Sequence, residues 1–222
     1  MRKVLCVLLF IPVLIFSQPA PRPLLVPYVF GGISSDHFGV RIDNMVEEHE
    51  FGQEAARRNA FVTGAGIQLT NIGTNGAGRL DLEAQFEFYG GEFRFDSISG
   101  TGIQDSILAR RKYNGLGIIP RLNWGVTLHD VFQPYVGLGV SIHRITIDDQ
   151  SGWSIGPDLA AGMRLNIIGF CNARFQVETA PLPPLELSLS GTTPLGQYVY
   201  FVEPGFVSVF VGIEFLLCIG CF

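Results

Sequence analysis

The sequence predicts an all-β fold, an eight-stranded antiparallel up-and-down transmembrane β-barrel, and three observations support this prediction. In the run Leu80–Phe88 every even position is apolar and every odd position is charged or polar, which indicates a β-strand with one dry and one wet face. A secretory leader precedes the strands, and short and long links alternate between them. In a soluble sheet the dry face would pack on a core, whereas in such a barrel it faces lipid and the wet face lines the lumen.

The N-terminal segment, residues 1–17, is predicted to be a cleaved signal peptide. Arg2 and Lys3 form its basic start and Val4–Phe16 its apolar stretch. This stretch is too short to span a membrane comfortably, and the proline-rich segment after it would break a helix at once. Residues 18–222 are predicted to form a single outer-membrane β-barrel domain, because no linker or repeat divides them.

Eight segments carry the strand pattern: Val26–Ile33, Phe61–Leu69, Leu80–Phe88, Tyr113–Val126, Tyr135–Ile145, Ile155–Ile167, a segment starting near Arg174, and Phe206–Phe215. In the second segment, Gly64, Gly66 and Gln68 occupy the face opposite the apolar side chains. The third segment is expected to continue toward Phe95. Gly90–Gly91 shift its phase by one residue, which predicts a β-bulge there.

The later segments divide their faces in the same way. Leucine and isoleucine side chains lie opposite Arg121 in the fourth segment, and valine and leucine lie opposite His143 in the fifth. Apolar residues alternate with Arg164 in the sixth segment and with Arg174 in the seventh. In the last segment the outward face begins at Val207 and is mainly valine. All of these segments are therefore expected to share one orientation, with the apolar face outward.

The links between the segments alternate in length. Three are short: Asn71–Gly78, Leu128–Gln133 and Gly169–Asn172. Two on the other side are long, Ser34–Ala60 and Glu92–Arg111, and a short one near Asp148–Trp153 is the exception. Short periplasmic turns and long external loops are typical of outer-membrane barrels.

The composition excludes some classes of partner. Without Arg2 and Lys3 the chain has thirteen basic and twenty acidic residues, a net charge of −7. An acidic chain with no basic run argues against a nucleic-acid partner. No other segment is a continuous apolar run long enough for a transmembrane helix, so alternating strands must account for the many apolar residues.

The stretch Gln133–Val140 resembles the Pro-Tyr-Val-Gly-x-Gly strand of the small eight-stranded outer-membrane barrels of the OmpA, OmpX and OmpW type. The final strand Val207–Phe215 and the closing Phe222 are similar to the C-terminal signal that the barrel-assembly machinery reads. Either Phe215 or Phe222 could supply its aromatic residue, because residues 216–221 interrupt the alternation. The resemblance implies a bacterial outer-membrane location, contact with membrane lipid and lipopolysaccharide-type glycolipid, assembly by that machinery, and no cofactor.

The face that points into the lumen carries six carboxylates and three guanidinium groups: Asp81, Glu83, Glu87, Asp158, Glu178 and Glu214, with Arg121, Arg164 and Arg174. Unpaired charges in a narrow lumen are costly, so these groups should form hydrogen-bonded ion pairs. The expected strand order predicts the pairs Arg174–Glu214 and Glu83–Arg121. Because an eight-stranded interior is just wide enough for side chains to fill it, a plugged lumen is expected.

We interpret the chain as a barrel with a structural or surface-interaction role, in which loops could contact an extracellular ligand. A second hypothesis is a passive conduit for small hydrophobic solutes, since OmpW-like barrels are thought to release such molecules sideways into the bilayer. Pro181, Pro183 and Pro184 could weaken one strand pairing enough for such an exit, or could simply end the strand.

A third hypothesis is a lipid-A-modifying barrel enzyme. Ser141 and His143 share a face, and Asp158 would lie nearly opposite His143 if Asp148–Trp153 closes a hairpin. Their order and spacing match no motif of those enzymes, so no catalytic residue is assigned.

Two further groups of residues are candidate sites. Cys171 should lie near the end of the last strand, so a disulfide to Cys218 or Cys221 is expected, with a Cys218–Cys221 bond or free thiols as alternatives. The first long link contains the acidic run Glu47–Glu50, which could be solvated, contact a ligand or hold a divalent cation. No zinc-protease motif is present there, and no metal site is assigned.

Overall fold

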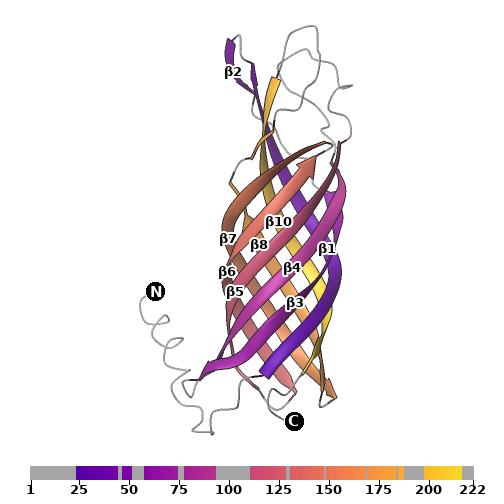
Figure 1. Ribbon diagram of the computed structural model, residues 1–222, viewed down its shortest axis with the longest axis vertical. Helices are drawn as coiled ribbons and strands as arrows, with labels where there is room; N and C mark the ends of the chain where they lie inside the picture. The colour runs from indigo at the N-terminus through magenta and orange to yellow at the C-terminus, as the bar shows by residue number, and fades with distance from the viewer. Residues whose placement is uncertain are drawn as a thin grey trace, which may run out of the picture.

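The computed structural model describes residues 24–44, 47–51, 58–74, 78–93, 111–128, 131–147, 149–168, 170–183, 185–187 and 198–216. Eight strands form the barrel: β1 (Leu24–Asn44), β3 (Arg58–Thr74), β4 (Arg79–Phe93), β5 (Arg111–Gly125), β6 (Phe132–Ile147), β7 (Gln150–Ile168), β8 (Cys171–Pro181) and β10 (Tyr198–Phe215). Neighbouring strands are antiparallel, and β1 pairs with β10 to close the sheet (Figure 1). The fold class predicted from the sequence is confirmed. No helix in the described part of the chain is long and apolar enough to cross a membrane.

Side chains alternate between lumen and exterior, as the period-2 pattern predicts. The exterior carries a belt of exposed apolar residues. Leu138, 63% exposed, pairs with Leu122 on one side and with Leu159 on the other, and Leu122 pairs in turn with Leu82. Such a continuous apolar surface would be an aggregation hazard in water, and it is the expected surface of a barrel whose solvent is lipid.

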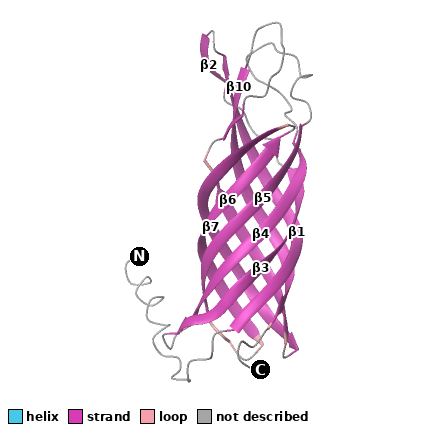
Figure 2. Cartoon of the chain, viewed as in Figure 1, coloured by secondary structure: helices cyan, strands magenta, loops and turns pink. Residues whose placement is uncertain are grey.

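The sheet extends beyond the barrel at the end away from the short turns (Figure 2). There β1 and β10 remain paired as far as Asn44 and Tyr198. Two short strands, β2 (Glu47–Phe51) and β9 (Leu185–Leu187), pair with β1 and β10 respectively. The prediction that Ser34–Ala60 is a loop was therefore wrong for most of its length, because pairing with β10 keeps that segment extended. The predicted short connection to β7 is confirmed by the Ile147–Gln150 pair.

The predicted bulge at Gly90–Gly91 is also wrong, because β4 pairs with β5 in continuous register across both residues. The glycine at position 91 instead makes room for an inward aromatic ring. A Cβ atom on Gly91 would lie 2.9 Å from the hydroxyl oxygen of Tyr113. The register shift between β3 and β4 lies between Leu69 and Gly73, where Asn71 adopts a left-handed φ of 59°.

Replacing Leu138 by Arg should lower the free energy of unfolding by about 2–4 kcal/mol, because it places a charge in the lipid-facing belt. The matched control is Trp153→Arg, which lies four residues from the chain turn at the rim and should cost about 0–1 kcal/mol. Urea unfolding of the chain refolded in phospholipid vesicles measures both values. Equal losses at the two positions would contradict the assignment of the belt.

Candidate functional site: the charged network in the lumen

Three arginines lie in the centre of the lumen, one on each of β5, β7 and β8. Arg121, Arg164 and Arg174 are each at most 1% exposed. They point inward because each occupies the polar phase of its strand, and their neighbours in sequence point to the exterior. Guanidinium groups at this depth must find acceptors within the barrel, since isolation from water without partners would be very costly.

Arg121 bonds to acids from three different strands. Its Nη1 donates to Glu83 on β4 at 2.9 Å, and its Nη2 donates to Glu178 on β8 at 2.7 Å. Its Nε donates to Asp158 on β7 at 2.5 Å. Because β4 lies across the barrel from β7 and β8 in the strand order, this side chain bridges the lumen.

Arg174 and Arg164 form a second set of bonds toward the short-turn end of the barrel. Arg174 Nη2 donates to both oxygens of Glu83 at 2.8 Å, and its Nη1 donates to Glu214 at 3.3 Å. Arg164 donates to Glu214 at 2.9 Å and to Asp81 at 3.2 Å. Both pairs predicted from strand order, Arg174–Glu214 and Glu83–Arg121, are present. Of the two ion pairs of Arg174, however, the one with Glu83 is the shorter.

Neutral side chains complete the network. The sequence analysis placed Gln68 on the polar face without giving it a role and did not consider Tyr28. Tyr28 donates to Glu83 at 2.8 Å, and Gln68 donates to Asp81 at 2.8 Å. The guanidinium carbon of Arg174 lies 4.3 Å from the centre of the Tyr28 ring, a cation–π contact. Both residues share the inward phase of their strands, and that phase is the signal that could have identified them.

Glycine provides the space for the Tyr28 ring. A Cβ atom on Gly66, the residue paired with Tyr28 on β3, would lie 2.2 Å from the ring. Any side chain at that position would displace the tyrosine from its bond to Glu83.

A fourth arginine, Arg79, joins the network at the short-turn end. Its Nε donates to Asp81 at 3.1 Å. The residue immediately precedes the alternating run and has the same phase as Asp81, so its place on the inward face was readable from the sequence.

Glu87 stands apart from the arginines among the described contacts. Its Oε1 lies 3.6 Å from Nδ1 of His143, and it accepts a bond from Gln85 at 3.4 Å. His143 also lies 3.0 Å from the hydroxyl oxygen of Tyr89. Glu87 therefore marks the outer end of the charged network.

Above Glu87 the lumen becomes apolar, which the sequence analysis did not anticipate. The tilted rings of Tyr89 and Phe206 are in contact, with their centres 4.8 Å apart, and Ile145, Ile147 and Leu182 are buried in the same half. The inward phase near the long-link end thus carries mainly hydrophobic side chains, whereas the phase near the short turns carries most of the charges. The lumen has a polar half and an apolar half.

The Ser–His–Asp arrangement considered above does not form. His143 pairs with Ser154. Asp158 lies four residues beyond Ser154 on β7 and pairs with Gly139 instead. Asp158 is held by Arg121, and the Ser141 hydroxyl donates to the backbone oxygen of Gly156 at 3.3 Å. The expectation that Asp158 faces His143 was wrong because the tight hairpin fixes a different register.

The prolines lie beside a break in the strand pairing. Pairing between β7 and β8 ends at Leu159–Thr179, although β7 itself continues back to Gln150. Pro181 is the last residue of β8 and pairs only with Gly205 of β10. The backbone oxygen of Pro183 accepts a bond from the Ser154 hydroxyl at 3.1 Å. Pro184 lies outside the described residues.

The remaining candidates fall wholly or partly outside the described residues. Cys171 begins β8, opposite Phe215, but Cys218 and Cys221 are not described, so the disulfide stays a prediction. The backbone of Glu47–Glu50 forms part of β2, whose side chains are not described. Residues 1–17, the expected signal peptide, are likewise not described.

No protein-family model matches the chain, and no curated protein matches it in sequence. Solved structures do match. The outer membrane protein OprG from Pseudomonas aeruginosa is 15% identical with a TM-score of 0.57, covering 89% of this chain and 99% of its own. Neisserial surface protein A is 11% identical with a TM-score of 0.43, covering 86% and 97%. The outer membrane protease OmpT from Escherichia coli is 12% identical with a TM-score of 0.44, covering 87% and 97%. The likeness to OprG establishes the fold, that of a small outer-membrane barrel.

The bond between Glu83 and Arg121 should be strongly coupled to stability. We expect Glu83→Gln and Arg121→Met each to lower the free energy of unfolding by about 3–5 kcal/mol, because each leaves buried partners unpaired. The double variant should lose less than the sum, by about 1–3 kcal/mol. Urea unfolding in vesicles tests this, with the exposed Arg144→Met as control, expected to change stability by less than about 0.5 kcal/mol. Strictly additive losses would contradict the coupling.

Proposed function

We propose that this chain is a bacterial outer-membrane barrel with a closed lumen and a structural or surface-interaction role. The observation that supports this most directly is the bridging of the lumen by Arg121, which bonds to Glu83, Asp158 and Glu178 on strands from both sides of the barrel. A side chain bonded to three acids across the lumen obstructs a polar path for ions. The apolar half above them adds a second barrier.

The extension of the sheet gives the surface role its physical basis. Strands β2, β1, β10 and β9 form a continuous row in the strand order beyond the barrel rim. With the short turns in the periplasm, this row projects from the cell surface, where an extracellular ligand could bind it. The belt around Leu138 would contact membrane lipid and lipopolysaccharide-type glycolipid, and the barrel-assembly machinery would insert the chain.

Single-channel recording in planar bilayers tests closure. The unaltered chain should show no stable ion current, whereas the double variant Arg121→Ala with Glu178→Ala should show discrete openings, because it removes the bridge and one of its acids together. Arg144→Ala serves as the control and should stay silent. Stable openings of the unaltered chain would overturn the closed-lumen proposal.

A second candidate function, a conduit that releases small hydrophobic solutes sideways, is favoured by the pairing break between β7 and β8. The break begins beyond Leu159–Thr179, beside Asp158 at the edge of the charged network, and continues toward the end where Ile145 and Ile147 are buried. A solute entering from outside would be stopped below by the charged network. Beside it would lie the proline segment, which contacts β7 through the Ser154–Pro183 bond instead of a strand ladder. Such a conduit would pass no ions across the membrane.

Substitutions that restore backbone N–H donors at the break distinguish the closed barrel from the conduit for hydrophobic solutes. Pro181→Thr with Pro183→Thr should slow entry of the hydrophobic dye N-phenylnaphthylamine into intact cells several-fold if solutes leave there, because the new N–H groups can extend the ladder. Pro120→Thr on β5, away from the break, is the matched control. Equal dye entry with and without the protein would rule the conduit out.

A further inference from the structure

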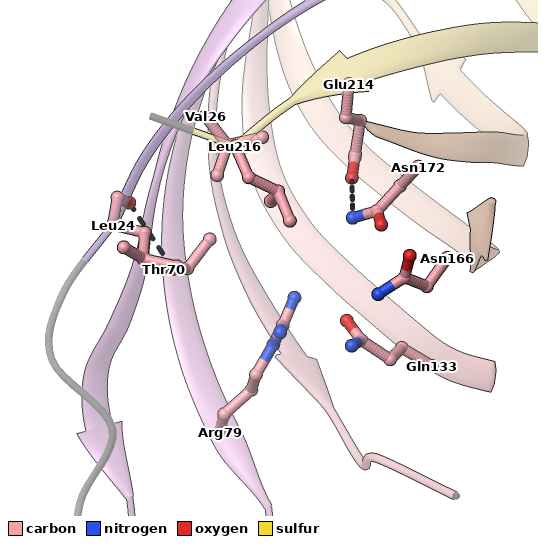
Figure 3. A pocket seen from close by; sticks show the side chains of 9 residues that line it. All are labelled: Leu24, Val26, Thr70, Arg79, Gln133, Asn166, Asn172, Glu214 and Leu216. Carbon is pink, nitrogen blue, oxygen red and sulfur yellow. Dashed lines mark hydrogen bonds between the residues drawn. The ribbon is translucent and has the colours of Figure 1, made fainter. Parts of the chain in front are cut away.

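A small pocket of about 100 Å³ opens at the short-turn end of the lumen, below the charged network (Figure 3). Its walls come from every barrel strand except β5. Neither of the two proposed functions, the closed barrel and the conduit with a lateral exit, involves this pocket. It lies at the periplasmic mouth in the orientation argued above, so its ligands would come from the periplasm.

Hydrogen-bond donors gather on one side of the pocket. The Nε atom of Arg79 is bonded to Asp81, while its other two nitrogens have no bond to the part of the chain that the structure describes. Figure 3 shows the Arg79 guanidinium directed at the same space as the amides of Gln133 and Asn166. This fork of N–H groups matches the geometry of a carboxylate.

Acceptors lie beside these donors. Asn172 is 4% exposed and donates through Nδ2 to Glu214 at 3.3 Å, but its Oδ1 has no partner. The Oε1 atom of Gln133 is also buried without a partner. Buried carbonyl oxygens are normally satisfied, so these two atoms indicate that an N–H or O–H group from outside the chain belongs in the pocket.

An apolar wall faces the polar side and is formed by Leu24, Val26 and Leu216. A water needs about 10–15 Å³ of such space, so the pocket has room for on the order of seven to ten non-hydrogen atoms. A ligand that fits all three parts has a carboxylate, an adjacent N–H donor and a small apolar substituent.

We propose that the periplasmic mouth of the barrel binds the carboxyl-terminal group of a small amino acid, either free or at the end of a peptide. The carboxylate would bond to Arg79, Gln133 and Asn166. The neighbouring nitrogen would donate to Oδ1 of Asn172 and Oε1 of Gln133, the two unpartnered oxygens, and the side chain would rest on the apolar wall.

Titration of the refolded, isotopically labelled chain in phospholipid nanodiscs, followed by NMR, tests the proposal. The probes are alanine, alanylalanine, acetate, methylammonium and inorganic phosphate. Alanine or alanylalanine should produce saturable shifts in the side-chain amide signals of Asn166 and Asn172, at concentrations at least tenfold below any response to the other three. Saturation by alanine alone identifies a free amino acid, and saturation by alanylalanine alone identifies a peptide end.

Variants give the second arm of the test. Arg79→Gln should weaken binding at least tenfold while leaving Asp81 with its bonds from Gln68 and Arg164. Asn166→Ala, which removes a side chain with no bond to the described residues, should weaken it less. Arg144→Gln at the opposite end is the matched control and should bind normally. Heat-dependent gel mobility verifies that each variant is folded.

Three results would overturn the proposal. The first is the absence of saturable shifts, which would mean that the pocket holds only water. The second is equal binding of acetate or phosphate, which would mean a general anion site. The third is unchanged affinity in folded Arg79→Gln.

Discussion

Three guanidinium groups enclosed in a narrow lumen are the constraint on which the rest of this structure depends. Each must be met by acceptors in the folded barrel, because water cannot solvate all of its N–H groups there. Arg121 and Arg174 meet at Glu83, and Arg174 and Arg164 meet at Glu214. These shared acids connect strands that are not neighbours in the sheet. A shift of any one strand by a single residue would turn its charge toward lipid, so the network and the register fix each other.

The sequence was sufficient for the parts of the molecule that depend on local periodicity. The period of two predicted the inward face of the six carboxylates and three arginines of the network, and the strand order then predicted the pairs Glu83–Arg121 and Arg174–Glu214. It was not sufficient where tertiary pairing overrides local signals. Nothing in the segment after Ile33 alternates clearly, yet pairing with β10 keeps β1 extended to Asn44.

Other features depend on which side chains meet across the lumen, and one sequence does not reveal that. The sequence suggests that Gly91 is a bulge residue, whereas in the fold it leaves space for the ring of Tyr113. His143 and Asp158 were expected to face each other, but the hairpin after Ile147 sets His143 against Ser154. The bond of Tyr28 on β1 to Glu83 on β4, which passes over β3, is of the same kind. The candidate site could be predicted as a set of inward-facing residues and two of its ion pairs, but its other bonds between strands that are not neighbours could not.

The seam between β1 and β10 joins the two ends of the barrel sequence, with Tyr28 opposite Glu214. Contacts between residues so far apart in the chain carry a large loop-closure entropy and form late in folding. Until β10 pairs with them, β1 and β8 each have an edge of backbone N–H and C=O groups without hydrogen-bond partners, and the bilayer cannot supply any. A nascent chain of this kind therefore needs an external template that pairs with its free edges. It is most exposed to misassembly and proteolysis before its last strand has paired.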